Sequence, residues 1–350
     1  MELDLMESRE LIKIATQLPP NQYNPLRELF FPVAKDRPSF STVIDYEVKT
    51  MNNDVSTLQA RNGKAKVVGK KDSKIISLTP PTIREKQEAT PRFLRGFSAS
   101  TIYNKTPEEI LQMRDDAIFE MIRDLKTRAE NRIGVMACQL IETGKIQYTE
   151  NVLADGSGGF DFQIDLAWPI ELLPALGAGL RWNEANAAIS ANLETWSQIM
   201  AKYSSAPNAI LMGANAYNSF ANNAKVQGDY DRLNFRVGSL SPASDKILQG
   251  TYQNFEVYKA PAFQYKAENG TMKYLYNPNK VTLFNKEVVQ QYNEILFGLI
   301  EEVNSDAVGE MYFSKQWEEQ DPSTIWTLLA CAPIPVLPIE GSVLTATVQV

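Results

Sequence analysis

The segment Thr106–Gly144, TPEEILQMRDDAIFEMIRDLKTRAENRIGVMACQLIETG, decides the fold of this 350-residue chain. Thr106 is a typical helix N-cap, Pro107 suits the first helical position, and Glu109 completes a capping box. Gly144 stands where a C-terminal cap is expected. The pattern therefore predicts one helix over residues 107–143. Its apolar positions, spaced by three, four or seven, include Ile110, Ala117, Ile118, Met121, Leu125, Ala129, Ile133, Met136 and Leu140.

A helix of this length constrains the shape of the whole molecule. At 1.5 Å per residue it is about 55 Å long. A compact chain of 350 residues has a radius of gyration of about 20 Å, which corresponds to a sphere about 53 Å across. One helix therefore spans the molecule, and the sequence predicts a flat or elongated shape.

Two extended segments precede this helix. Ser41–Val48 alternates between polar and apolar residues, as a half-buried strand does, and Lys74–Thr79 is a second extended segment that stops at Pro80-Pro81. The polar stretch between them contains Asn62-Gly63, a typical hairpin turn. We expect a long two-stranded arm here.

The charge of the chain is unevenly distributed. The formal net charge is −7, yet residues 61–95 contain ten basic and three acidic side chains. Residues 301–321 contain seven acidic side chains and one lysine. A basic arm in an acidic chain indicates either a solvated hairpin or an arm that lies over an acidic neighbour.

The composition argues against most catalytic and metal chemistry. The chain has no histidine, which excludes Ser-His-Asp and Cys-His arrangements. Cys138 and Cys331 are too few for a four-ligand zinc site and lack C-x-x-C spacing, so we expect two buried thiols. We predict no catalytic, cofactor-binding or metal-binding residue and no cofactor.

Neither a membrane span nor a signal peptide is indicated. The longest apolar stretch, Thr324–Pro338, is shorter than a membrane span and contains three prolines. The first residues, MELDLMESRE, lack a basic region followed by an apolar one. We expect a soluble intracellular protein with no membrane partner.

The order of the remaining elements predicts an α+β fold with interleaved layers, without regular βαβ alternation. Helices are expected within residues 1–17, from Asn183 to the proline at 207, and over about 214–224. Strands are expected at 145–152, 160–168, 209–212, 254–258, 273–276, 280–284, 324–330 and 343–350.

Several blocks, in this order and spacing, resemble the major capsid protein E family of lambda-like tailed phages. The resemblance covers nearly the whole chain, although no single block is diagnostic. The blocks are NPLRELFF at 24–31, LTPP at 78–81, MRDD at 113–116, VY at 257–258, YLYNPNKV at 274–281, LFN at 283–285, DP at 321–322 and LLACAPIPVL at 328–337, followed by a valine-rich strand.

The resemblance implies the tailed-phage major capsid fold of the Hong Kong 97 phage type, with a long spine helix, an extended β-hairpin arm, and peripheral and axial domains. It divides the chain into an N-terminal arm (1–40), the extended loop (41–81), a peripheral domain with the spine helix (82–181), a mostly axial region (182–315) and C-terminal strands that return to the peripheral domain (316–350).

The resemblance also implies a function. The chain would be a non-enzymatic major capsid protein that assembles as hexamers and pentamers into an icosahedral shell around double-stranded DNA. Implied partners are other copies of itself, a separate scaffolding protein, a portal, an optional decoration protein and non-specifically bound packaged DNA. Its location would be the virion, and the host cytoplasm during assembly. The alternatives are another self-assembling virion protein, such as a tail protein, and an enzyme that uses carboxylates and lysines.

Charge suggests which residues form the subunit interface. We expect the basic residues of the arm to lie over an acidic surface of a neighbouring copy, with contact of the arm with packaged DNA as the alternative. The basic candidates are Arg61, Lys64, Lys66, Lys70, Lys71 and Lys74, and the acidic candidates are Glu318, Glu319 and Asp321.

Overall fold

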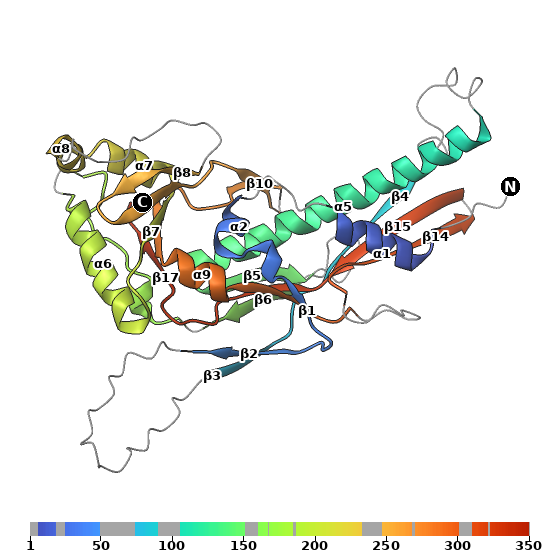
Figure 1. The fold of residues 1–350 in the computed structure, drawn as a ribbon, viewed down its shortest axis with the longest axis horizontal. Helices are drawn as coiled ribbons and strands as arrows, with labels where there is room; N and C mark the ends of the chain where they lie inside the picture. The colour runs from blue at the N-terminus through green and yellow to red at the C-terminus, as the bar shows by residue number, and fades with distance from the viewer. Residues whose placement is uncertain are drawn as a thin grey trace, which may run out of the picture.

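The computed structural model describes most of the 350 residues and shows an elongated α+β molecule (Figure 1). The described residues are 6–18, 25–49, 74–89, 106–150, 160–166, 168–184, 187–232, 247–267, 270–300, 310–320 and 323–349. One long helix crosses most of the molecule, as the sequence predicts, and sheets and shorter helices pack along its length.

That helix is α5, Pro107–Thr143, and both of its predicted ends are confirmed. The Thr106 side chain accepts a hydrogen bond from the Glu109 amide, and the Glu109 carboxylate accepts one from the Thr106 amide. Gly144 ends the helix with φ of 68°, and its Cα lies close to Trp168, since an added Cβ would be 2.8 Å from that ring. Both the left-handed backbone and the lack of space therefore require glycine at this position.

A five-stranded sheet lies at the C-terminal end of α5, in the order β17-β12-β7-β9-β8. β7 and β9 are parallel, and the other neighbours are antiparallel. Side chains of one face, such as Val257 and Leu344, pack with α6 and α7, whereas those of the other, such as Leu211 and Phe284, join the core around α5. The strands are β7 Ala209–Met212, β8 Leu248–Tyr252, β9 Phe255–Lys259, β12 Lys280–Phe284 and β17 Val343–Thr347, and the helices are α6 Ile189–Tyr203, α7 Ala214–Ala221 and α8 Ala224–Arg232.

A three-stranded antiparallel sheet, β14-β15-β4, lies along the N-terminal half of α5. Ala89 and Ile325 of one face pack on Met121 of α5. On the other face, Phe313 and Leu328 pack on Ile12 of α1. The sheet is therefore covered on both faces by helices. Its strands are β4 Ile83–Ala89, β14 Phe313–Gln320 and β15 Ser323–Cys331, and α1 is Ser8–Gln17.

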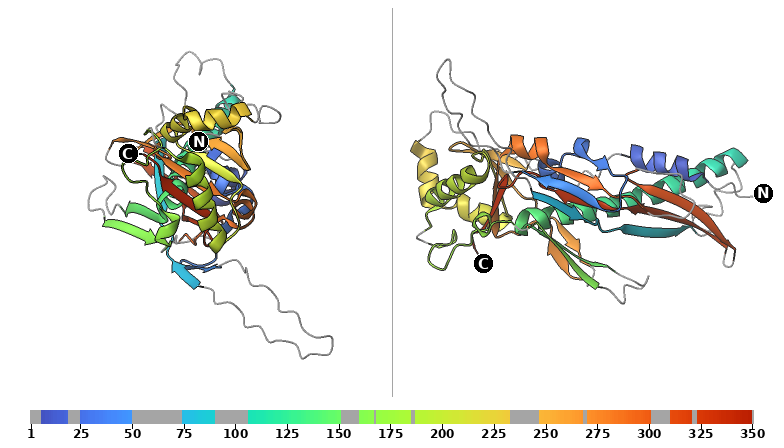
Figure 2. Two further views of the ribbon diagram at one scale, coloured as in Figure 1. Left: turned by 90° about the vertical axis from the view of Figure 1, so that its left-hand side faces the viewer. Right: turned by 90° about the horizontal axis from the view of Figure 1, so that it is seen from below.

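Smaller elements connect these layers. β1, β13 and β16 form a second three-stranded sheet, and β2–β3, β5–β6 and β10–β11 are two-stranded antiparallel pairs. Figure 2 shows β5–β6 and β10–β11 projecting from the same side of the plate. The bounds are α2 Pro25–Phe30, η1 Val33–Lys35, β1 Arg37–Pro38, β2 Ile44–Val48, β3 Lys74–Leu78, β5 Lys145–Glu150, β6 Phe160–Asp165, η2 Ile170–Leu172, β10 Gln264–Lys266, β11 Met272–Tyr274, α9 Lys286–Tyr292, β13 Glu294–Phe297 and β16 Pro333–Val336.

The helix expected from Asn183 begins later, at Ile189. The preceding backbone instead covers the edge of β17: the Leu176 amide donates to the Thr347 carbonyl and the Trp182 amide donates to the Val348 carbonyl. At the expected start the backbone forms turns, in which the Glu184 amide donates to the Arg181 carbonyl and the Ala187 amide donates to the Glu184 carbonyl. The helix expected over about 214–224 is α7, which ends at Ala221, and a further helix that was not predicted, α8, begins at Ala224.

The C-terminal strands do not stay together. β14 and β15 pair with β4 beside α5, whereas β17 pairs with β12 in the five-stranded sheet. The strands of residues 316–350 are therefore divided between two sheets. The alternating apolar residues of β17 complete the larger sheet instead, where Leu344 and Ala346 are buried.

Candidate functional site

The root of the predicted arm is a two-stranded antiparallel pair. β2 and β3 are paired from Ile44–Leu78 to Val48–Lys74. Ile44 and Tyr46 are buried against the body, while Asp45 is exposed, so the alternation read from the sequence is confirmed for this strand. In Figure 1 the pair lies below the body, beside neither α1 nor β14.

Backbone hydrogen bonds fasten this root to the body. The Ser39 amide donates to the Phe297 carbonyl at 2.6 Å, and the Leu299 amide donates to the Ser41 carbonyl at 3.1 Å. On the other side, the Lys49 amide donates to the Pro338 carbonyl at 2.7 Å. The root is therefore fastened to β13 and to the loop after β16.

The structure describes only part of the predicted interface. Lys74 is exposed at the start of β3. Glu318 and Glu319 are exposed near the end of β14, far from β3 in Figure 1. Within one subunit these charges are not brought together. The remaining candidates, Arg61, Lys64, Lys66, Lys70, Lys71 and Asp321, lie outside the described residues.

Glu318 and Glu319 do not form one acidic surface. Successive strand residues point to opposite faces, so Glu319 shares the α1 face with Trp317 while Glu318 points to the α5 face. The Glu319 carboxylate accepts a hydrogen bond from the Trp326 indole N–H at 2.7 Å. Glu318 is exposed on that face.

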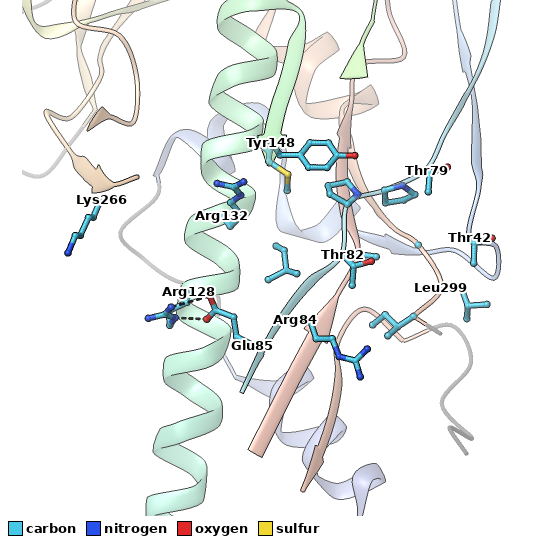
Figure 3. Close-up of a pocket in the computed structure, with 17 residues that line it drawn as sticks. Thr42, Thr79, Thr82, Arg84, Glu85, Arg128, Arg132, Tyr148, Lys266 and Leu299 are labelled. Atoms are coloured by element: carbon cyan, nitrogen blue, oxygen red, sulfur yellow. Dashed lines mark hydrogen bonds and ion pairs between the residues drawn. The ribbon is translucent and has the colours of Figure 1, made fainter. Parts of the chain in front are cut away.

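A groove beside the arm root was not predicted from the sequence. It has a volume of about 910 Å³ and lies between α5, the start of β4, the arm root and the loop 298–300 (Figure 3). Four cations and one carboxylate line it. Arg84 and Glu85 come from β4, Arg128 and Arg132 from α5, and Lys266 from β10.

One of those cations is already neutralised. Arg128 donates from Nε to Glu85 at 2.5 Å and from a terminal nitrogen at 3.1 Å, and this hydrogen bonding raises the pKa of the Arg128 guanidinium. Figure 3 shows Arg84 on the other side of β4 from Glu85, with Lys266 and Arg132 across the groove. The groove was missed in the sequence analysis because the charged residues that line it are up to 182 positions apart. None of them stands out in the sequence by itself.

A buried ionic cluster attaches the N-terminal segment to α5. The Arg27 guanidinium of α2 donates to Glu130 of α5 and to Asp36 after η1. Tyr312 donates its hydroxyl proton to Glu130 at 2.5 Å. Lys126, one turn from Glu130, donates to the Ala15 and Leu18 carbonyls at 2.8 and 2.6 Å and so caps the C-terminus of α1.

Burial and the neighbouring charges together shift the pKa values of the groups in this cluster. Burial raises the pKa of Asp36 to about 7, although Arg27 acts in the opposite direction. Burial by itself would lower the pKa of Arg27, but Glu130 and Asp36 raise it above its ordinary value. Burial lowers the pKa of Lys126. Every one of these groups joins two structural elements, and none faces a ligand cavity described above.

A second polar network joins α5 to the five-stranded sheet. Half-buried Glu142 accepts a hydrogen bond from the Asn277 amide at 2.6 Å and lies 3.6 Å from the Lys280 ammonium nitrogen. Thr282 and Thr345 hydroxyls are 2.8 Å apart, and Thr345 donates to the Ile141 carbonyl at 2.8 Å. These contacts hold the sheet at a fixed position on the helix.

The described residues offer no evident catalytic or metal centre. Among them no group of three or more Cys, Asp and Glu side chains is placed to hold a metal ion. Cys138 and Cys331 are buried free thiols, as predicted, and burial raises the pKa of each. No described helix has the length and apolar character needed to cross a bilayer. On its outer surface the described part of the chain presents the arm root, β2 and β3, and the groove beside it.

Comparison with known proteins identifies one family. The family model described as phage major capsid protein E matches residues 7–348. A candidate prophage capsid protein of Escherichia coli CFT073 superposes with a TM-score of 0.71 at 17% identity, covering 99% of this chain and 100% of that one. A phage-related protein from Bordetella bronchiseptica RB50 gives 0.51 at 12% identity, covering 98% of each chain. No curated protein sequence matches. At these low sequence identities, the similarity to the two structures shows that they share their fold with this chain.

Proposed function

Because this chain belongs to the phage major capsid protein E family and is a shell-forming structural protein of the virion, we propose that it assembles as hexamers and pentamers into an icosahedral shell around packaged double-stranded DNA. The observation that carries this proposal is the family match over residues 7–348. An elongated molecule with a projecting arm root is suited to packing side by side with copies of itself in a shell. The buried polar networks that join its layers would keep each subunit rigid.

We assign the regions of the chain as follows. Residues 1–40 form the N-terminal arm, 41–81 the extended loop, 82–181 the peripheral domain with α5 as its spine, and 182–315 most of the axial domain. The packing of β4, β14 and β15 on α5 supports the peripheral assignment. The five-stranded sheet with α6 and α7 supports the axial one, to which we add β17 because it pairs with β12.

We propose that the extended loop overlaps a neighbouring copy. A two-stranded hairpin is marginally stable by itself, so a long one gains most of its order from contact with another surface. Backbone hydrogen bonds anchor the root, β2 and β3, to the body, and the root lies at the margin of the body (Figure 1). Its basic residues, Lys64 to Lys74 among them, would lie over acidic residues of that neighbour.

The remaining partners follow from assembly of a shell. We propose a separate scaffolding protein, a portal and an optional decoration protein, with non-specific contact to packaged DNA and assembly in the host cytoplasm. We also propose that the chain has no enzymatic activity and needs no cofactor. The buried thiols and buried ionic groups support this, since their altered pKa values arise in the packing between elements.

Electron microscopy of the purified full chain tests the proposal. Closed shells, hexameric rings or pentameric rings are expected. Open tubes without shells would instead favour a tail protein, and a stable monomer under all assembly conditions would overturn self-assembly. The measurement needs no partner and separates these outcomes directly.

A further inference from the structure

The arm root, the strand pair of β2 and β3, has apolar side chains on both of its faces. Ile44 and Tyr46 point toward the body and are buried. By the alternation of strand residues, Val43 just before β2 and Ile75 of β3 lie on the opposite face, where they are 46% and 69% exposed. A strand pair that is apolar on both faces is typical of a sheet held between two layers. The body is one layer, and the exposed fractions show that no described residue supplies the other.

This outer face of the arm root also carries a negative charge. Asp45 is exposed there, paired across the strands with Ser77 and diagonally beside Ile75. The next charged residues along the strand, Glu47 and Lys49, form an ion pair with each other at 2.9 Å. The outer face therefore fits a surface that is apolar and positively charged.

The strand pair β10–β11 presents a surface of that kind. Its inner face carries Tyr265, which packs against the core around α5. Its outer face carries the four residues that alternate with Tyr265, namely Gln264, Lys266, Met272 and Tyr274. All four are exposed, Met272 at 60% and Tyr274 at 47%. Lys266 is paired directly with Met272, so a positive charge lies beside exposed apolar side chains.

The two outer faces do not meet within one molecule. In Figure 1, β2 and β3 lie below the body, whereas β10 lies above β5 and β6. The exposure of Ile75 and of Met272 agrees with this, since mutual contact would bury both side chains. Complementary surfaces that are separate in one chain are available to two copies of it, and this chain belongs to a shell-forming family.

We propose that the outer face of the arm root packs against the outer face of β10–β11 of a second copy of this chain. Sheets packed face to face are about 10 Å apart, which lets Asp45 approach Lys266 of the partner subunit. The contact joins different surfaces of identical molecules, so it closes into a ring when the rotation between copies allows it. It rests on the proposed function, since it needs assembly of copies, and it is separate from the contact proposed for the lysines of the extended loop.

A charge exchange between the two faces tests the contact. The root variant is Asp45→Lys and the hairpin variant is Lys266→Glu. We expect each to raise the subunit concentration needed for assembly by about tenfold, because each places two like charges together. The double variant restores the pair with reversed sign and should return to within about threefold of the wild type. Single variants that assemble as the wild type does, or a double variant no better than the single ones, would rule out the contact.

The charge-matched controls are Glu194→Lys for the root variant and Lys225→Glu for the hairpin variant. Both residues are exposed, on α6 and α8, and both controls should assemble as the wild type does. If each control weakens assembly as much as its matched variant, net charge is responsible and the contact is wrong. If the wild-type chain forms neither shells nor rings, the proposed function itself is wrong.

The apolar part of the contact has a test of its own. Ile75→Ser and Met272→Ser shorten side chains that are exposed in the single subunit, so circular dichroism of the unassembled variants should match the wild type. Each variant should raise the assembly concentration by about tenfold, because less apolar area is buried when copies associate. If neither variant changes assembly, the two faces are not in contact.

A cross-link identifies the two faces directly. Both native cysteines are buried, so thiols introduced by Ser77→Cys and Gln264→Cys are the reactive ones. A short bismaleimide reagent should convert assembled double variant into a ladder of covalent multimers, because each subunit offers one thiol to each of two neighbours. The control pair, Ser77→Cys with Gln198→Cys on an exposed position of α6, should give no ladder. Intact shells of the first pair that yield no ladder would contradict the contact.

Discussion

Arg27 and Glu130 are 103 positions apart in the sequence and form a buried ion pair that joins α2 to the middle of α5. Both side chains are at most 6% exposed. The pair attaches the N-terminal segment to the helix that organises the molecule, because Asp36 binds the same guanidinium and Tyr312 the same carboxylate. Its loss would therefore affect four segments together.

Arg27→Ala should lower the free energy of unfolding by about 3–5 kcal/mol, because it leaves Glu130 buried without its partner. Denaturant unfolding of the unassembled protein measures this. Arg123→Ala is the control, since Arg123 is exposed and lies 3.7 Å from Glu120, and it should cost at most about 1 kcal/mol. Equal effects of the two substitutions would contradict the structural role of the buried pair.

Asp36 predicts how stability depends on pH. Its pKa of about 7 in the folded protein is above the ordinary value of 3.8, so the folded state binds this proton more tightly than the unfolded state. The resulting stabilisation is fully present below about pH 4 and is lost as the pH rises to about 7. The slope contributed by one such group is at most about 1.4 kcal/mol per pH unit.

Asp36→Asn removes that titration and should flatten the stability curve between pH 4 and 7. Denaturation midpoints at several pH values, for wild type and variant, provide the comparison. Asp45→Asn, at an exposed position of β2, is the control and should keep the wild-type slope. Identical slopes in wild type and Asp36→Asn would show that Asp36 is ionised in the folded protein throughout this range.

The C-terminal cap of α5 can be tested with a single methyl group. Gly144→Ala places a Cβ 2.8 Å from Trp168 on a backbone with φ of 68°, and we expect a loss of at least about 2 kcal/mol. Gly177→Ala is the control, since nothing lies within 4 Å of its Cβ, and it should stay within about 0.5 kcal/mol. Thermal unfolding followed by circular dichroism distinguishes the two.

Local patterns predicted α5, the β2–β3 pair and β12 well, since caps, alternation and turn residues act over a few positions. β4 was missed because IREKQEA has four charges in seven residues, and its strand form depends on pairing with β15, more than 230 positions later. The same separation hid the groove, whose lining comes from α5, β4, β10 and the arm root. Helix α6 was placed too early because Asn183 is a typical N-cap residue, whereas the folded chain has turn hydrogen bonds from Glu184 to Arg181 and from Ala187 to Glu184 before the helix begins at Ile189.

The basic arm gives the last prediction. Lys64→Glu, Lys66→Glu and Lys70→Glu, combined, should sharply reduce shell formation if these lysines lie over an acidic neighbour. Each exposed ion pair stabilises the contact by only about 0–1 kcal/mol, yet the contact recurs at every subunit of the shell.

Wild-type assembly should also weaken as the salt concentration rises, because exposed charges are screened within about 10 Å at 0.1 M.

The control for the arm variant reverses Lys13, Lys202 and Lys225 to Glu. These lysines are exposed on α1, α6 and α8, and the two triple variants have the same net charge. Sedimentation and electron microscopy compare their shell yields at equal concentration. If both triple variants lose assembly equally, net charge is responsible and the arm has no special role. If the arm variant assembles as the wild type does, the arm lysines do not bind an acidic neighbour.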